Sequence, residues 1–123
     1  MAGGLTVRLY IAGPMRGFPL FNFPAFDEAE RYLLSLGFEV VNPAEIDRRN
    51  GFDPSAVHPL NDFTDEEMAT FFMRDVDNLM LCDGVVLLPG WEHSIGATAE
   101  FHIARWLRKQ TLIYPHLLAF EKP

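Results

Sequence analysis

The sequence has one cysteine, Cys82, in 123 residues, so an internal disulfide framework is excluded. It also lacks any apolar run close to the roughly 18 residues that a membrane-spanning helix needs. Basic residues are scarce, because 10 Lys and Arg against 17 Asp and Glu give a net charge of -7. This charge disfavours a nucleic-acid surface or an anionic membrane as partner. It still permits a small anion, which one arginine and a few backbone N–H groups can hold.

Several sequence signals of cofactors and targeting are missing as well. No charged leader precedes an apolar segment, so we expect a cytoplasmic protein. The four histidines show no paired ligand spacing, and neither a P-loop nor a G-x-G-x-x-G pattern occurs. We therefore expect no metal and no cofactor. With 49% hydrophobic and 22% charged residues, residues 1–123 are expected to form a single globular domain.

Apolar, β-prone runs alternate with helical patterns along the chain. The runs predict strands at 5–13, 38–43, 84–90 and 111–115, and helices starting near 22–24 and ending at Gly37, over 64–81, and over 94–107. Thr64 and Glu67 form the capping-box pattern that begins the second helix. This order predicts an α/β fold of the flavodoxin or Rossmann-like type, with three layers and a parallel sheet of four to five strands flanked by helices. The polar segment 45–63 is predicted to be a loop over a site or an interface.

Two carboxylates fall on helix faces that are otherwise apolar. Glu100 shares its face with Ala97 and Ala104, and Asp75 shares its face with Met68 and Phe72. An unpaired buried charge costs several kcal/mol, so each residue needs a reason to be there. Either each one serves a chemical role, or it pairs with an arginine such as Arg8 or Arg16, or its place near a helix end puts it at the rim of the core.

Possible anion-binding groups surround the edge where parallel strands end. The segment AGPMRGFP after the first strand supplies Gly13, Arg16 and Gly17, and the third helix begins with Ser94 and Gly96. Ligands of open parallel sheets bind outside the carboxyl ends of the strands, so these groups are placed to form an anion cradle. Ser94 is equally expected as an ordinary N-cap.

Three segments together carry a resemblance to a known family. They are YIAGPMRG at 10–17, RDVDNLMLCDGVVLL at 74–88 and SIGATAEFHIA at 94–104. In order and spacing they resemble the nucleoside 2-deoxyribosyltransferase superfamily, and within it the 2′-deoxynucleoside 5′-phosphate N-hydrolases and related phage-type proteins. The resemblance covers most of the chain except 45–63 and the last eight residues.

The resemblance implies roles for particular residues. Glu100 matches the nucleophilic glutamate of the Ser-x-Gly-x-x-x-Glu motif, Asp75 the aspartate of the Asp-x-x-x-Leu motif, and Tyr10 the tyrosine that holds the nucleophile. In the hydrolase branch, the first-loop arginine and the third-helix serine hold the 5′-phosphate, which here are Arg16 and Ser94. These assignments imply a small nucleotide or nucleoside as partner, and a homodimer or higher homo-oligomer.

The chemistry of N-glycoside cleavage suits these residue types. One carboxylate can attack or stabilise the cationic sugar carbon, and a second, protonated carboxyl can donate to the departing base. Glu100 is thus the expected nucleophile, kept ionised by Tyr10, and Asp75 the expected general acid with a raised pKa. If water resolves the intermediate the protein is a hydrolase, and if a second base does it is a transferase.

Other interpretations stay open at this point. A non-catalytic nucleotide sensor would share the fold, and a glycohydrolase of a larger nucleotide such as NAD would also need a glutamate. Trp91 and the phenylalanines of the GFPLFNF segment are expected either to stack on a base or to pack against another subunit. The charged residues Asp47, Arg48 and Arg49 are expected to form a solvated face.

Overall fold

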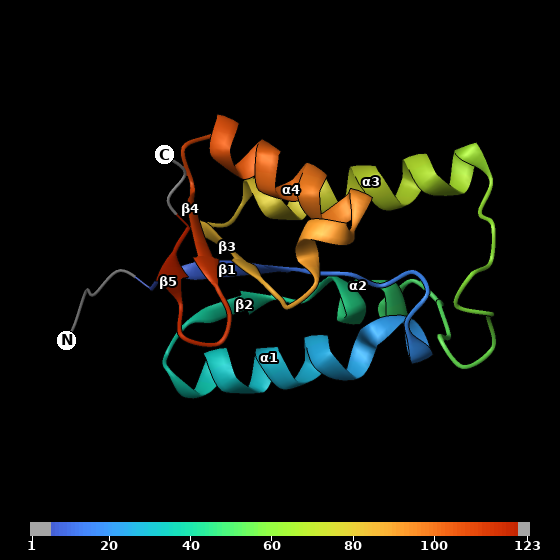
Figure 1. Cartoon of the computed structure of the whole chain (residues 1–123), viewed down its shortest axis with the longest axis horizontal. Helices are drawn as coiled ribbons and strands as arrows, with labels where there is room; N and C mark the ends of the chain where they lie inside the picture. The colour runs from blue at the N-terminus through green and yellow to red at the C-terminus, as the bar shows by residue number, and fades with distance from the viewer. Residues whose placement is uncertain (1–5, 121–123) are drawn as a thin grey trace.

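A computed structural model describes residues 6–120 of the chain. Its five-stranded sheet has the order β2-β1-β3-β4-β5 (Figure 1). Strands β1 to β4 pair in parallel and β5 pairs antiparallel with β4. The strands are Arg8–Ala12, Glu39–Val41, Gly84–Leu87, Gln110–Ile113 and Leu118–Ala119. The prediction of an α/β fold with a parallel sheet of four to five strands is confirmed, with the edge strand β5 as the exception to parallel pairing.

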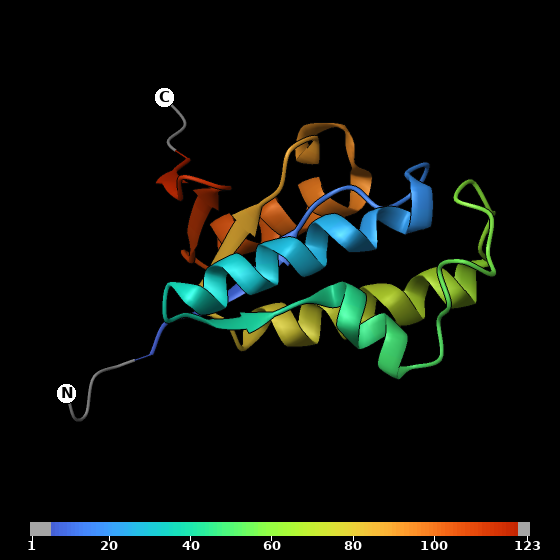
Figure 2. The same ribbon diagram turned by 90° about the horizontal axis from the view of Figure 1, so that it is seen from below.

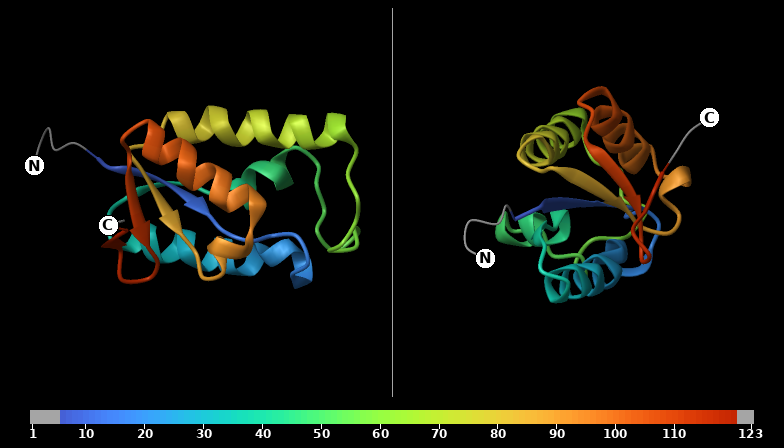
Figure 3. Two further views of the ribbon diagram at one scale, coloured as in Figure 1. Left: turned by 45° about the horizontal axis from the view of Figure 1, so that its top comes forward. Right: turned by 90° about the vertical axis from the view of Figure 1, so that its left-hand side faces the viewer.

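Helices cover both faces of this sheet. The four α-helices are α1 (Phe23–Ser35), α2 (Pro43–Arg49), α3 (Asp65–Met80) and α4 (Ile95–Trp106). Figures 1 and 2 show α1 along one face of the sheet and α3 and α4 on the opposite face. The end-on view in Figure 3 shows the sheet between these two layers. No helix within residues 6–120 is long and apolar enough to cross a membrane.

The alternation of side chains along β1 creates two separate cores. Leu9 and Ile11 face the core that contains α1, whereas Tyr10 and Ala12 face the core beneath α3 and α4. All four side chains are buried. Because successive residues of a strand point to opposite faces, a strand covered on both sides has to be apolar throughout. Tyr10 is the one polar side chain in this stretch, and it points toward α4.

Local sequence signals set the ends of the helices as predicted. The Thr64 side chain accepts a hydrogen bond from the backbone N–H of Glu67, and the Glu67 carboxylate accepts one from the N–H of Thr64. Ser94 caps α4, since its Oγ accepts from the N–H of Ala97 at 3.1 Å. Gly37 follows α1 with a φ of +93°, a conformation that a residue without Cβ adopts at little cost.

One part of the prediction needs correction. Segment 45–63 is not a loop throughout, because α2 covers Pro43–Arg49 and only the remainder is irregular. Asn42 caps this helix by accepting from the N–H of Ala44, and Pro43 stands at its first position, where a missing N–H costs nothing. The expected first strand began at Leu5, which lies outside the described residues.

Candidate active site

A cavity of about 960 Å³ opens where the strands end. Its walls come from the segments after β1 and β3, from α2, α3 and α4, and from the irregular segment before α3. In the strand order, the chain turns to opposite sides of the sheet at β1 and β3. A crevice outside the carboxyl ends of two such strands is the place where open α/β sheets bind ligands.

The buried hydroxyl of Tyr10 contacts Glu100, which lines this cavity. It donates a hydrogen bond of 2.5 Å to Oε2 of Glu100, from β1 across to α4. Tyr10 is 0% exposed, and burial, together with the charge of Glu100, raises its pKa well above the usual 10. The tyrosine therefore stays a hydrogen-bond donor and fixes the direction in which the Glu100 carboxyl group faces.

Both predicted catalytic carboxyl groups line the same cavity. Burial, with the nearby charge of Asp75, raises the pKa of Glu100 to about 8, although the bond from Tyr10 opposes this shift. Burial, with the charge of Asp47, raises the pKa of Asp75 to about 7. The raised pKa of Asp75 agrees with the expectation for a general acid. Tyr10 donates the expected hydrogen bond to Glu100 and lowers its pKa, but the expectation that this bond keeps Glu100 ionised is not met, because burial outweighs it.

Asp47 was expected on a solvated face, and the structure places it in the cavity wall instead. It extends from α2 toward α3, where its carboxylate pairs with Arg74 at 3.3 Å. The Asp47 side chain is 14% exposed, and burial raises its pKa to about 6. Asp47 is thus a third carboxyl group that acts on the other two. No periodic pattern marked it, because α2 is too short to show one.

The Arg74 guanidinium lies beside these acids. It stacks over the ring of Phe71, with 5.4 Å from Cζ to the ring centroid. Its Nε is buried and has no hydrogen-bond partner among the described residues. Its charge lowers the pKa of both Asp47 and Asp75. One cation on α3 therefore offsets part of the negative charge of Asp47 and Asp75.

The arginines expected as possible partners of Asp75 and Glu100 pair with other residues. Arg8 pairs with Glu39 at 3.4 Å, and Arg16 pairs with Asp62 at 2.7 Å. Neither reaches Asp75 or Glu100. The alternative that these acids are structural partners of Arg8 or Arg16 is therefore wrong.

The predicted anion cradle is assembled in part. Arg16, Ser94 and Gly96 line the cavity together with Gly13. The N–H of Gly17, however, donates to the carbonyl of Pro59 at 2.9 Å. Gly13 serves packing, because a Cβ at this position would lie 2.8 Å from Cβ of Leu88. Of the predicted anion-binding donors, Arg16 and the beginning of α4 are the ones that line the cavity.

An aromatic cluster forms another wall of the cavity. It contains Phe21, Phe23, Phe52, Phe63 and Phe71, whose rings meet at centroid distances from 5.1 to 6.4 Å. Phe21 reaches this wall from a left-handed backbone with φ of 52°. Such a conformation costs a bulky residue of order 1–3 kcal/mol and is found most often at functional sites.

Three large apolar side chains lie where the sequence did not predict them. Trp91 does not line this cavity, because it is buried in the core beneath α3 and α4, where its ring lies tilted on Phe101 at a centroid distance of 4.9 Å. Met68 and Phe72 of α3 were expected in the core beside Asp75, yet they are 52% and 54% exposed. They line the cavity, since this half of α3 extends past the end of the sheet (Figure 3).

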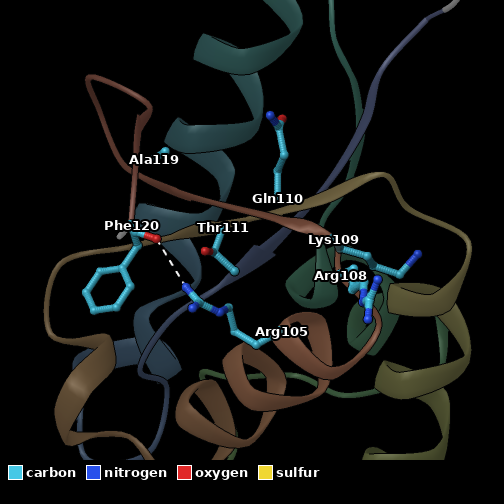
Figure 4. A pocket seen from close by; sticks show the side chains of 7 residues that line it. All are labelled: Arg105, Arg108, Lys109, Gln110, Thr111, Ala119 and Phe120. Carbon is cyan, nitrogen blue, oxygen red and sulfur yellow. Dashed lines mark hydrogen bonds between the residues drawn. The ribbon is translucent and has the colours of Figure 1, made fainter. Parts of the chain in front are cut away.

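A second cavity, of about 330 Å³, lies near the C-terminal end of α4. Figure 4 shows its three cationic side chains, Arg105, Arg108 and Lys109. Arg105 donates to the carbonyl of Phe120, and Lys109 donates to the carbonyls of Met80 and Cys82. Two of the three cations thus hydrogen-bond backbone carbonyls, one after β5 and two near the C-terminal end of α3, which is a structural role. Among residues 6–120 no group of three or more His, Cys, Asp or Glu is arranged to hold a metal ion.

Comparison with known proteins gives a family for the chain. The family described as "Domain of unknown function (DUF4406)" matches residues 7–113. The chain belongs to this family. No curated protein sequence matches it at a significant level.

A solved structure is similar to this fold. It is that of a 2-deoxyribosyltransferase from the psychrotolerant bacterium Bacillus psychrosaccharolyticus, with a TM-score of 0.60 and 20% sequence identity. The match covers 87% of this chain and 71% of that chain. At this level of identity the likeness shows the fold alone.

Proposed function

We propose that this protein is an N-glycosidase that cleaves the bond between base and sugar of a (deoxy)nucleoside 5′-monophosphate, with Glu100 as nucleophile. The observation that supports this proposal most is the 2.5 Å hydrogen bond by which buried Tyr10 aims Glu100, beside Asp75 in one cavity. The fold likeness to a 2-deoxyribosyltransferase agrees with this chemistry.

The first half of the reaction forms a bond to Glu100. A carboxylate oxygen of Glu100 attacks C1′ of the sugar while the bond from C1′ to the base nitrogen breaks. The electron pair of that bond leaves with the base, and Asp75 donates the proton that neutralises it. Positive charge develops at C1′ during this step, and a negative Glu100 stabilises it.

The second half restores the enzyme. Water attacks C1′, the ester bond to Glu100 breaks, and Asp75 takes the proton that the water loses. If a second base attacks C1′ in place of water, the same residues carry out a transfer. The fold likeness to a transferase is the observation that makes this second activity worth measuring in the same assay.

The acid pair holds one proton between the pKa values of about 7 for Asp75 and about 8 for Glu100. Because Glu100 has the higher pKa, that proton lies on Glu100 in the free protein. The reaction needs that proton on Asp75. A positive charge developing at C1′ and the donor of Tyr10 both favour the ionised form of Glu100, so the substrate itself moves the proton to the place where it is needed.

Arg16 and the beginning of α4 are the groups proposed to hold the phosphate. Ser94 has a hydroxyl hydrogen to donate, and the N–H groups of Ile95 and Gly96 have no acceptor within the helix. The positive end of the helix dipole favours an anion at the same place. The base is proposed to lie against the aromatic cluster.

We also propose that the protein is a homo-oligomer. Large apolar side chains are exposed on α3 and α4, among them Met73 at 63%, Ile95 at 90% and Trp106 at 86%. Exposed apolar groups of this size on neighbouring helices are typical of subunit contacts. Sedimentation equilibrium measures the mass, and a monomer at micromolar concentration would contradict the proposal.

A substrate panel tests the function. The protein is incubated with nucleosides, their 5′-monophosphates and NAD, with and without a second base, and the released or exchanged base is measured by chromatography. Glu100→Gln should lower base release by several orders of magnitude and retain ligand binding, whereas Glu92→Gln, at an exposed position, should not. A Glu100→Gln protein with more than about a tenth of the wild-type rate would exclude Glu100 as nucleophile.

A further inference from the structure

The segment 59–62 lies across the loop that follows β1. The N–H of Gly17 donates to the carbonyl of Pro59 at 2.9 Å. Nη2 of Arg16 donates to the carbonyl of Leu60 at 3.0 Å and to Oδ1 of Asp62 at 2.7 Å. The Gly17 N–H and the Arg16 guanidinium, two donors that an anion at this loop would use, therefore already have partners within the chain.

The partner of Arg16 is an anion of the same chemical kind as a phosphate oxygen. Carboxylate and phosphate both accept charge-assisted hydrogen bonds from a guanidinium in similar geometry. Arg16 is the only arginine or lysine among the residues that line this cavity, whereas Asp47, Asp62, Asp75 and Glu100 all line it. A phosphate that enters has to share this one cation with Asp62 and also meets its negative charge.

We propose that Asp62 determines the preference of the enzyme at the 5′ position of its substrate, by occupying Arg16 in competition with a 5′-phosphate. This inference rests on the proposed function for its biological meaning, and on the 2.7 Å ion pair for its geometry. Asp62 lowers the affinity for a 5′-monophosphate and leaves the affinity for the corresponding nucleoside unchanged. It is a specificity-determining residue and takes no part in bond cleavage.

The exposure of the pair makes this competition reversible. The side chains of Arg16 and Asp62 are 58% and 92% exposed, and ion pairs in water are weak. A phosphate dianion can displace Asp62, and the segment 59–62 then loses one of its attachments. Removing Asp62 frees Arg16 and abolishes the repulsion, so we expect phosphate to bind about three- to tenfold more tightly.

Inorganic phosphate is the probe that tests this inference without turnover. It is titrated into wild-type protein, Asp62→Asn, Arg16→Ala and the double variant, and binding is followed through the backbone amide signals of residues 15–18 in heteronuclear NMR spectra. Asp65→Asn is the matched control, because it removes the same charge from an exposed residue that has no contact with Arg16. Asp62 is also exposed, so its substitution leaves the fold intact.

We expect Asp62→Asn to bind phosphate more tightly, Asp65→Asn to match the wild type, and the gain to vanish in the Arg16→Ala background. Equal phosphate affinity for Asp62→Asn and wild type, or an equal gain for Asp65→Asn, would overturn the inference. Activity is measured separately. If the phosphate affinities behave as expected and no nucleotide or nucleoside releases a base, the proposed function fails and the role of Asp62 at Arg16 stands.

Discussion

Glu100→Gln is expected to make the protein more stable while it removes activity. The wild-type carboxyl has a pKa raised from 4.5 to about 8, mainly by burial. Between these two pH values the folded protein binds this proton more tightly than the unfolded chain does. The free energy of unfolding therefore decreases as the pH rises through this window. Glutamine has no proton to lose, so the variant avoids that cost.

The size of the effect follows from the same pKa values. Each pH unit above the ordinary pKa costs the folded state about 1.4 kcal/mol, up to the folded-state pKa. At pH 7 the cost approaches about 3 kcal/mol, and at pH 5 it falls to about 1 kcal/mol. Because Glu100 is of intermediate exposure, we expect the free energy of unfolding of Glu100→Gln to exceed that of the wild type by about 2–3 kcal/mol at pH 7. The glutamine carbonyl can still accept the hydrogen bond from Tyr10.

Urea unfolding of the two proteins at pH 5, 6, 7 and 8, followed by circular dichroism, measures this difference. The gain from Glu100→Gln should increase steadily with pH, whereas Glu92→Gln, at an exposed position, should show no such trend. A variant that is less stable than wild type at pH 7, or a gain that is the same at every pH, would refute the reasoning. Either result would mean that the carboxyl group at Glu100 is not destabilised by its burial.

Four further predictions concern the chemistry of the cavity. Asp75→Asn should suppress cleavage of natural substrates by about 10²–10⁴-fold and spare a substrate with a nitrophenolate leaving group; equal losses on both, with a lower melting temperature, would instead indicate a structural role. The pH profile of kcat/KM should be bell-shaped with its maximum between the pKa values of about 7 and about 8. Asp47→Asn should move both limbs to lower pH, because the charge of Asp47 raises the pKa of both acids; an unchanged profile would show that Asp47 does not act on them. Arg16→Ala should raise KM for a 5′-monophosphate by about tenfold or more and leave KM for the nucleoside unchanged, and equal losses for both substrates would assign Arg16 to the fold.

Most of the architecture could be predicted from the sequence, because the signals that set it are local. Alternating apolar runs and helical patterns predicted the strands, the capping pattern of Thr64 and Glu67 predicted the beginning of α3, and Ser94 proved to be the N-cap of α4. A carboxylate on an apolar helix face is costly to bury, and for this reason the sequence pattern alone identified Glu100 and Asp75 as candidate site residues. Both side chains do line one cavity.

Which side chains meet in the site could not be predicted, because these contacts join distant parts of the chain. Asp47 lies on a helix of seven residues, too short for a periodic pattern, and its pairing with Arg74 joins residues 27 positions apart. The attachment of Asp62 to Arg16 spans 46 positions, so it depends on how the irregular segment packs. The pKa of Glu100 likewise depends on two opposing effects, burial, which raises it, and the hydrogen bond from Tyr10, which lowers it. Both effects exist only once the chain has folded.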